Sequence, residues 1–224
     1  MEIKIQKRVL EANETEAEKN RRFFKEKNVF VLNMMSSPGS GKTETLCKTL
    51  VKLMPGMGVG VIVGDICTTN DGDRLEKTGA KVIQINTDKF GGDCHLSASL
   101  VMDSAQRLGC DDIDLLIVEN IGNLVCPAEF DIGEDARAVV LSLTEGEDKP
   151  LKYPLMFQVA DVAILNKIDL LPYLDADADL ASDNMKKVHP HLPVFQISAK
   201  TEQGFEPWLE WLKVKVFEKT GKGL

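Results

Sequence analysis

The sequence predicts a single α/β domain built on a mostly parallel β-sheet with helices on its faces. The first observation is a series of short apolar runs along the chain, most of them followed by a segment with helical potential. The second is that these runs are rich in valine and isoleucine and apolar on both faces, as the buried strands of a parallel sheet are. Because strands and helices alternate, we expect a doubly wound arrangement, and 224 residues suffice for one such domain with a substantial core.

The first expected element is a helix over residues 6–27, which carries charged side chains along most of its length. Its apolar stripe is thin and consists of Val9, Leu10, Ala17 and Phe24. So narrow an apolar face is not typical of a helix that packs in a protein core. We therefore predict that residues 1–28 form a helical arm appended to a single domain of residues 29–224.

The strands are expected to follow this arm. The apolar runs lie at residues 29–34, 59–64, 81–86, 115–120, 138–143, 162–167 and 193–198. Ligands on a doubly wound sheet bind beyond the carboxyl ends of its strands. The residues that directly follow each run are therefore the candidates for a functional site.

Composition and charge exclude several classes of protein. The formal net charge of −8 argues against a general nucleic-acid-binding or anionic-membrane-binding surface. No apolar run approaches the roughly 18 residues of a membrane-spanning helix, and the charged N-terminal segment lacks the apolar core of a signal peptide. We therefore expect a cytoplasmic protein. Its five cysteines follow no disulfide-scaffold spacing, which favours free thiols or metal ligands.

The segment "SSPGSGKT", residues 36–43, follows the first run and precedes a helical pattern. It matches the phosphate-binding loop G-x-x-x-x-G-K-[ST], except that Ser36 stands at the first glycine position. In such a loop, backbone N–H groups point at phosphate oxygens, the lysine bridges the β- and γ-phosphates, and the hydroxyl binds Mg²⁺. The residues predicted to bind the nucleotide here are Gly39, Ser40, Gly41, Lys42, Thr43 and Glu44. The alternative is an ordinary Gly/Ser turn, but the strand–loop–helix context favours a P-loop NTPase.

Two later motifs, "NKID" (166–169) and "ISAK" (197–200), indicate which nucleotide binds. Asp169 can accept two hydrogen bonds from the N1–H and N2–H₂ groups of guanine, whereas adenine offers no matching donors. The Lys167 stem can cover the base, and the Ser-Ala-Lys turn can offer a backbone N–H to guanine O6. The residues assigned to the guanine site are Asn166, Lys167, Asp169, Ser198, Ala199 and Lys200. The alternative for Asp169 is a helix N-cap.

Acidic residues at the ends of two further runs are expected to face the γ-phosphate. We predict that Asp65 holds Mg²⁺ and organises the attacking water, and that Glu119 supports the Mg²⁺ shell. Gly122 can bring its N–H close to the γ-phosphate. Together with Lys42, these residues are the predicted catalytic set. No glutamine stands in the usual water-positioning place after Gly122, so we expect slow intrinsic turnover unless a partner completes the site.

Taken together, "SSPGSGKT", "GDICTTNDGDRL", "GGDCHL", "ENIGNLVCP", "TEGEDKPLKYP" and "NKIDLLPY" resemble the HypB family of GTPases for nickel incorporation into [NiFe]-hydrogenase. The resemblance covers about residues 7–215. It implies a SIMIBI-class P-loop GTPase related to UreG that forms a GTP-promoted homodimer with a metal site at the dimer interface. It also implies two candidate partners, a HypA-like maturation factor and the hydrogenase large subunit. The chain departs from some members because it has neither an N-terminal C-x-x-C-G-C motif nor a histidine-rich stretch. N-terminal nickel binding and nickel storage are therefore not expected.

Cys94, His95 and Cys126 are the predicted ligands of Ni²⁺ or Zn²⁺. Two thiolates and an imidazole suit either ion, and a labile ligand or a second subunit must complete the site. Each residue considered alone has another interpretation. Cys94 is equally consistent with a small buried side chain, His95 with a histidine at a helix start, and Cys126 with a turn before Pro127. Cys126 follows Gly122 in the same segment, so we predict that the nucleotide state changes metal affinity.

Alternative functions remain at this point. One is a GTPase with another client, either urease or a cobalamin enzyme, although "CHL" with "NLVCP" argues against the cobalamin branch and the Cys-Pro-His triplet expected of urease types is absent. Another is a nucleotide-gated metal-binding module in which hydrolysis is incidental. The choice between nickel and zinc is also open.

Overall fold

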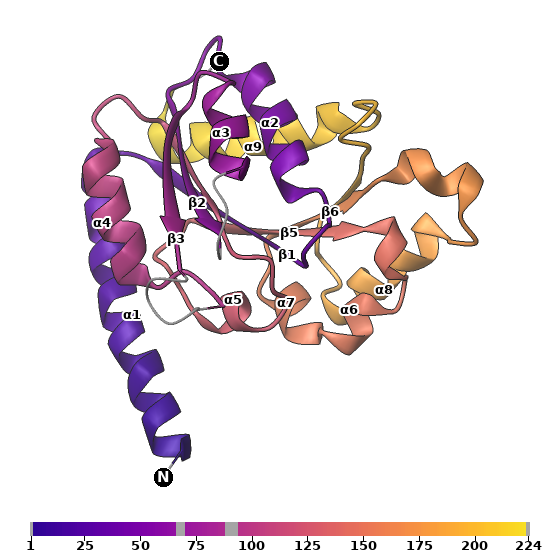
Figure 1. Ribbon diagram of the computed structural model, residues 1–224, viewed down its shortest axis with the longest axis horizontal. Coiled ribbons are helices and arrows are strands. Elements are labelled where there is room, and N and C mark those ends of the chain that lie inside the picture. Colours follow the sequence, from indigo (N-terminus) through magenta and orange to yellow (C-terminus); the bar gives the residue numbers. More distant parts are fainter. Residues whose placement is uncertain (1, 66–69, 88–93, 223–224) are drawn as a thin grey trace.

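The computed structural model describes residues 2–65, 70–87 and 94–222 (Figure 1). These residues contain a seven-stranded sheet in the order β3-β2-β4-β1-β5-β6-β7, in which every neighbouring pair is parallel. The strands are β1 (Phe30–Ser36), β2 (Val59–Asp65), β3 (Lys81–Asn86), β4 (Leu115–Glu119), β5 (Ala136–Ser142), β6 (Val162–Asn166) and β7 (Val194–Gln196). Because the strands run in one direction, all their carboxyl ends lie along one edge of the sheet.

Helices connect the strands and cover the sheet. The α-helices are α1 (Glu2–Lys27), α2 (Lys42–Leu53), α3 (Asn70–Glu76), α4 (Ala98–Leu108), α5 (Cys126–Glu129), α6 (Lys149–Lys152), α7 (Pro154–Gln158), α8 (Ala178–Val188) and α9 (Phe205–Thr220). Two 3₁₀ helices, η2 (Leu143–Glu145) and η3 (Ile168–Tyr173), follow β5 and β6. The predicted doubly wound α/β fold is confirmed.

Each predicted strand is present, with both ends within two residues of the prediction. The central strands β1 and β4 are buried along their whole length, and the edge strand β3 is partly exposed. The largest difference at a strand start is in β5, which begins at Ala136 because that residue pairs with Leu32 of β1. Burial on both faces is the reason that the short apolar runs located the strands so closely.

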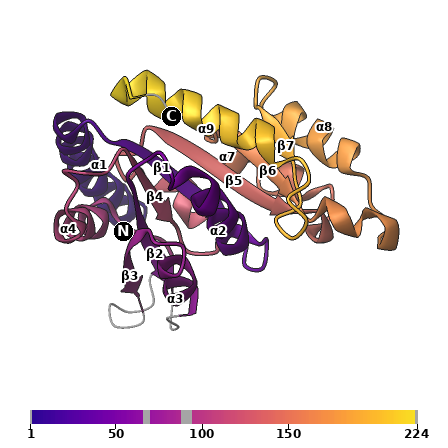
Figure 2. The same cartoon turned by 90° about the horizontal axis from the view of Figure 1, so that it is seen from above.

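Alternation along β1 divides the core between the two faces of the sheet. Phe30, Leu32 and Met34 belong to one cluster with side chains from α2 and α9. Val31 and Met35 point to the other face, where α1 and α4 cover one half and α7 and α8 the other. On the first face, the buried indole N–H of Trp208 in α9 donates to Thr49 Oγ1 of α2 at 3.0 Å, which ties the two helices together (Figure 2).

Helix α1 differs from the prediction of an appended arm. Its N-terminal end projects beyond the domain, but its second half lies along α4 (Figures 1 and 2). Phe24 is 1% exposed, and buried Asn20 donates through Nδ2 to the carbonyls of Ala98 at 2.7 Å and Ile132 at 2.9 Å. The prediction counted apolar side chains and gave no weight to an asparagine that is buried because it bonds to backbone carbonyls. The second half of α1 is therefore packed into the domain, and the division at residue 28 remains a prediction.

We expect Phe24→Ala to lower the free energy of unfolding by about 3–5 kcal/mol, as a buried phenylalanine replaced by alanine leaves a cavity. The matched control is Val9→Ala on the same helix, because Val9 is 49% exposed and its truncation should change stability by no more than about 0.5 kcal/mol. Urea denaturation of the full chain measures both. If Phe24→Ala lowered the free energy of unfolding as little as Val9→Ala, the packing of the second half of α1 against the domain would be contradicted.

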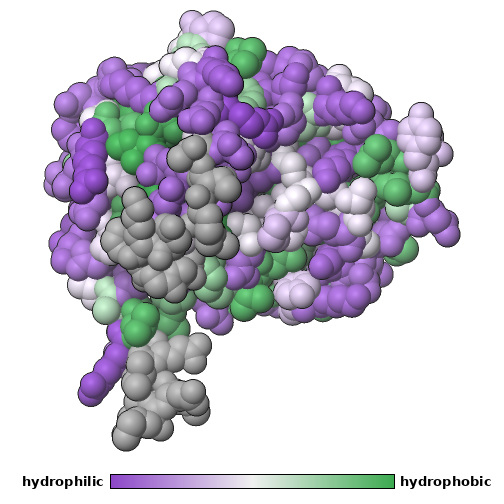
Figure 3. All heavy atoms as spheres, viewed as in Figure 1, coloured by the Kyte–Doolittle hydropathy of each residue, from purple (hydrophilic) through white to green (hydrophobic). Residues whose placement is uncertain are grey.

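The surface of the domain is ordinary for a globular protein. The face shown in Figure 3 is mostly hydrophilic, with small separate apolar areas. Within residues 2–65, 70–87 and 94–222, no helix combines the length and apolar character needed to cross a membrane.

Candidate nucleotide and metal site

A cavity of about 470 Å³ opens at the carboxyl ends of β1, β2 and β4. Its lining residues are Ser36, Ser37, Pro38, Gly39, Ser40, Gly41, Lys42, Thr43, Glu44, Gly64, Asp65, Asp71, Arg74, Glu119, Ile121, Gly122 and Lys167. The whole predicted phosphate loop and all the predicted catalytic residues are among them. The cavity therefore lies where ligands of doubly wound sheets bind.

The phosphate loop needs glycine at two positions. Gly39 and Gly41 have φ angles of +77° and +88°, in the left-handed region that other residues avoid. A Cβ atom on Gly41 would also lie 2.4 Å from Asn166 Nδ2. Gly41 precedes the first residue of α2, so the loop places backbone N–H groups at a helix N-terminus.

Lys42, Thr43 and Glu119 form a buried polar group at the bottom of the cavity. The Lys42 ammonium donates to the carbonyl of Asn120 at 2.5 Å and lies 3.9 Å from Glu119 Oε1, which also accepts from Thr43 Oγ1 at 2.7 Å. Burial lowers the pKa of the Lys42 ammonium, and the charge of Glu119 opposes that effect. Burial likewise raises the pKa of Glu119, against the influence of Lys42 and the hydrogen bond from Thr43.

The same group fits a divalent cation. Glu119 Oε2 is buried and has no hydrogen-bond partner among the residues that the structure describes, which is a costly state for a carboxylate oxygen. Asp65 ends β2, is partly exposed and lines the same cavity. Carboxylate and hydroxyl oxygens are the donors that Mg²⁺ prefers, so Thr43, Asp65 and Glu119 are chemically suited to it.

The predicted base-binding residues are hydrogen-bonded to the phosphate loop and to one another. Asn166 Nδ2 donates to the Ser40 carbonyl at 3.0 Å, and Asn166 Oδ1 accepts from the Ala199 N–H at 3.0 Å. Lys167 Nζ donates to the Gly39 carbonyl at 2.7 Å. These contacts join β1, β6 and the turn after β7, three segments that are distant in the sequence.

Asp169 lies in η3 rather than at its N-cap, which is Lys167. Its carboxylate accepts a hydrogen bond from Ser198 Oγ at 2.6 Å, and that contact fixes the position of one oxygen. Lys200 follows in the same turn and is exposed. The capping alternative for Asp169 therefore does not describe the structure.

Several residues of the site were not predicted from the sequence. Arg74 on α3 lines the cavity and pairs with Glu44, and it lies 3.8 Å from Asp71. Ser37 Oγ donates to Glu145, whose other oxygen accepts from the Ser142 N–H at 2.9 Å. Arg74 and Glu145 lie within quoted motifs, but the sequence alone assigns no role to a single arginine or glutamate there, so only the fold reveals that these side chains reach the phosphate loop.

The predicted metal ligands are brought together only in part. Cys94 Sγ and Cys126 Sγ are 2.7 Å apart, although one precedes α4 and the other begins α5. His95 Nδ1 is 3.9 Å from Cys94 Sγ, and the His95 ring stacks on Phe130 with 3.6 Å between centroids. Within the described part of the chain, no three histidine, cysteine or acidic side chains converge on one point as metal ligands do. Residues 91–93 and Cys67 lie outside the described residues.

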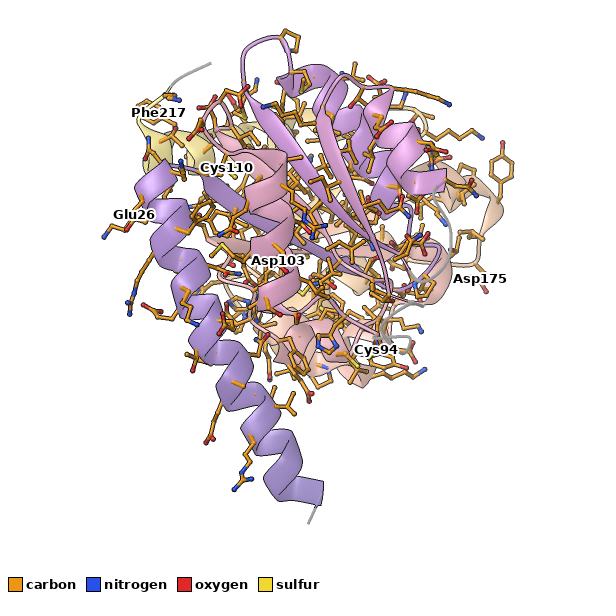
Figure 4. All side chains as sticks on the ribbon, turned by 60° about the vertical axis from the view of Figure 1, so that its left-hand side comes forward. Glu26, Cys94, Asp103, Cys110, Asp175 and Phe217 are labelled. Carbon is orange, nitrogen blue, oxygen red and sulfur yellow. The ribbon has the colours of Figure 1, made fainter. Side chains whose placement is uncertain are left out.

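The two thiols have the chemistry of a soft metal site. Burial and contact with Cys94 raise the pKa of the Cys126 thiol to about 11, because a second thiolate beside the first is unfavourable without a cation. Asn123 Nδ2 donates to Cys126 Sγ at 3.4 Å, as outer partners of metal ligands do. Cys110, in contrast, is buried far from this pair, and Figure 4 shows it at the opposite end of the domain from Cys94.

Comparison with known proteins agrees with this geometry. Residues 30–196 match the family model described as CobW/HypB/UreG, nucleotide-binding domain. The chain belongs to the CobW/HypB/UreG family. Within this family it is 47% identical to hydrogenase maturation factor HypB of Escherichia coli K12 over 215 residues, which are 96% of this chain and 72% of that protein. It is 40% identical to probable hydrogenase maturation factor HypB of Methanocaldococcus jannaschii over 216 residues, 96% of each chain.

Solved structures place the chain among the HypB members of the family. HypB from Archaeoglobus fulgidus superposes with a TM-score of 0.85 at 35% identity, covering 92% of this chain and 98% of that one. HypB from Helicobacter pylori in complex with nickel gives a TM-score of 0.85 at 36% identity, covering 93% and 97%. The signal recognition particle receptor FtsY from Elizabethkingia anophelis shares the fold at a TM-score of 0.56. The predicted family and P-loop NTPase fold are confirmed.

Proposed function

We propose that this HypB-family protein is a GTP-hydrolysing metallochaperone that assists nickel insertion into [NiFe]-hydrogenase, with metal affinity set by the bound nucleotide. The observation that carries the proposal is the segment after β4. It follows Glu119, the last residue of β4, passes Gly122 at the nucleotide cavity and reaches Cys126, whose Sγ is 2.7 Å from that of Cys94. The nickel complex of the Helicobacter pylori relative supports a nickel cargo.

Hydrolysis requires the phosphate end of the cavity. The N–H groups of Gly39 to Lys42 and the Lys42 ammonium bind the β- and γ-phosphates and stabilise the charge that develops in the transition state. Thr43, Asp65 and Glu119 hold Mg²⁺, which neutralises phosphate charge when bound. Asp65 orients a water for attack on the γ-phosphorus, so that the β–γ bridging bond breaks and GDP and inorganic phosphate form.

Guanine is selected next to the cavity, on the side of Lys167, by residues that lie beyond its lining. Asp169 has one oxygen on Ser198 Oγ and presents its carboxylate to the N1–H and N2–H₂ groups of the base. Lys167 covers the base with its stem, and the backbone of Ala199 and Lys200 binds O6. Asn166 bonds to the Ser40 carbonyl and to the Ala199 N–H, and so holds the phosphate loop against the Ser-Ala-Lys turn beside the base.

Metal binding requires Cys94 and Cys126 as thiolate ligands. His95 becomes a third ligand when its ring leaves Phe130, and a second subunit of a GTP-promoted homodimer completes the site. Thiolate and imidazole ligands accept both Ni²⁺ and Zn²⁺, so zinc competes for this site. A HypA-like maturation factor and the hydrogenase large subunit are the proposed partners that exchange the metal.

We expect Cys94→Ala and Cys126→Ala each to weaken Ni²⁺ binding more than about 100-fold, because even outer partners of metal ligands contribute about 10–100-fold. Calorimetric titration with GDP and with a non-hydrolysable GTP analogue measures the affinity, and light scattering reports the mass. The control is Cys47→Ala, since Cys47 is a partly buried thiol packed against the core beneath α2. Equal affinity in both nucleotide states would contradict the coupling of nucleotide and metal.

One comparison favours urease as a second client. The chain is 37% identical to hydrogenase/urease maturation factor HypB of Helicobacter pylori J99 over 218 residues, 96% of this chain and 88% of that protein. Complementation of a strain that lacks its own HypB, with hydrogenase and urease activities measured separately, distinguishes the two clients.

A further inference from the structure

Asn120 is the first residue after β4 and is completely buried between the nucleotide cavity and the cysteine pair. Its backbone carbonyl accepts the hydrogen bond from the Lys42 ammonium at 2.5 Å, and its backbone N–H donates to the Met34 carbonyl of β1 at 2.9 Å. Its side-chain Oδ1 accepts from the N–H groups of Leu96 at 3.1 Å and Ile121 at 2.9 Å. One residue therefore contacts the phosphate-binding lysine and the backbone of the Cys94–His95 segment.

The orientation of the Asn120 amide follows from its partners. Two backbone N–H groups point at one of its atoms, and only an oxygen can accept from both. The other atom is therefore Nδ2, which donates to Asn33 Oδ1 at 3.2 Å. Asn33 is fixed in turn, because its own Nδ2 donates to Glu134 Oε1 at 3.1 Å. Each polar group of Asn120 therefore has a hydrogen-bond partner. A movement of this residue strains both its bond to Lys42 and its bond to the Leu96 N–H.

The contact with Leu96 connects Asn120 to the metal ligands. Leu96 directly follows His95, is fully buried and packs against Gly64, where an added Cβ would lie 2.9 Å from its side chain. Cys126 follows Asn120 along the same segment through the turn that Ile121 and Gly122 begin. Both cysteine segments are thus attached to Asn120, one through a hydrogen bond and the other through the chain itself.

Phosphate binding must disturb this arrangement. An ionised phosphate is a stronger acceptor of the Lys42 ammonium than a neutral carbonyl, and the ammonium bridges the β- and γ-phosphates of GTP. The γ-phosphate therefore draws Lys42 further from the Asn120 carbonyl than the β-phosphate of GDP does alone. When Lys42 turns to the phosphate, the carbonyl loses its buried donor and the backbone at residues 120–122 must find a new partner. The Leu96 N–H is bonded to the side chain of the same residue, so the Cys94–His95 segment shifts with it.

We propose that Asn120 is the positioning residue that transmits the nucleotide state from Lys42 to the Cys94–Cys126 pair through its hydrogen bond to the Leu96 N–H. This inference rests on the proposed function, because it assigns a residue to the coupling of nucleotide and metal. Coupling of this kind is reciprocal, so it appears equally as a change in metal affinity with nucleotide and in nucleotide affinity with metal.

The experiment compares Asn120→Ala with Asn120→Asp in the full chain. The readout is the ratio of the Ni²⁺ dissociation constants measured with GDP and with a non-hydrolysable GTP analogue. For the wild type we expect a ratio in the range of about 5–150-fold that is typical of coupled sites. Asn120→Ala removes the acceptor of the Leu96 N–H, and its ratio should fall to within about twofold of one. Asn120→Asp keeps that acceptor and should keep most of the wild-type ratio.

A buried asparagine elsewhere provides the matched control. Asn184 on α8 donates to the Glu147 carbonyl at 3.0 Å, so Asn184→Ala costs a comparable buried bond but should leave the ratio unchanged. Hydrogen exchange at the Leu96 amide of the wild type is a second measurement that needs no variant to fold. Its protection should differ between GDP and the GTP analogue.

The outcomes separate this inference from the function on which it rests. A wild-type ratio of one contradicts the proposed coupling itself, whatever Asn120 does. A wild-type ratio well above one that persists in Asn120→Ala overturns the role of Asn120 alone. Unchanged protection of the Leu96 amide between the two nucleotide states also overturns it, because the proposed path passes through that N–H.

Discussion

Lys42→Ala is expected to lower the rate of GTP hydrolysis by at least about 10²–10³-fold, the loss found when one preorganised donor to transition-state charge is removed. The Lys42 ammonium is buried at the bottom of the cavity and lies 3.9 Å from Glu119 Oε1. Phosphate release at saturating GTP measures the rate, and a separate titration with GDP measures nucleotide affinity.

The control for this substitution is Lys48→Ala on the same helix. Lys48 Nζ forms a surface ion pair with Glu202 at 3.2 Å, and such exposed pairs contribute little to stability. Lys48 is not among the residues that line the cavity. Circular dichroism of both variants checks that Glu119, left without its cation, does not unfold the domain. Hydrolysis at the wild-type rate in folded Lys42→Ala would contradict the proposed site.

Asp169→Asn is expected to abolish most of the preference for GTP over ATP, which for a site built to bond specific donors is about 10⁴-fold or more. The carboxylate accepts two donors of guanine, whereas an amide presents an N–H₂ group to one of them. Xanthine carries a carbonyl where guanine has its N2–H₂ group, so the same variant should gain activity with XTP. Specificity constants for the three nucleotides measure the change.

Asp175→Asn is the matched control, because Asp175 is exposed in the loop after η3 (Figure 4). This variant should keep the wild-type preference, since it loses the same charge without removing an acceptor from the base site. Equal turnover of GTP and ATP by the wild type would defeat the guanine assignment before any variant is made.

The strands and the phosphate loop were predictable because their signals are local. A strand buried on both faces must be a short apolar run, and a loop that surrounds phosphate must carry glycine at positions such as Gly41. The N-terminal helix was also located from local pattern, but its packing was not. Asn20 is buried because two carbonyls from distant segments, those of Ala98 and Ile132, satisfy its amide.

The polar contacts within the site depend on the fold. Sequence reasoning assigned Asn166 and Lys167 to the guanine site, and the structure adds that both side chains also bond to carbonyls of the phosphate loop. Arg74 and Asn120 lie within the motifs "GDICTTNDGDRL" and "ENIGNLVCP", but no role was assigned to either of them. Cys94 and Cys126 were predicted to share a metal, and their approach to 2.7 Å makes that arrangement possible, while His95 is stacked on Phe130.

By itself, the sequence determined the order of the strands along the chain, the conformation of the phosphate loop and the residue types available for guanine and metal. Each of these depends on residues that are neighbours in the chain, so their chemistry is written in short motifs. Only the tertiary structure decided that the carbonyl of Asn120 would meet Lys42 while its side chain meets Leu96. Such contacts arise because parallel packing brings the carboxyl ends of β1, β2 and β4 to one edge, and no local pattern encodes which buried polar groups then face one another.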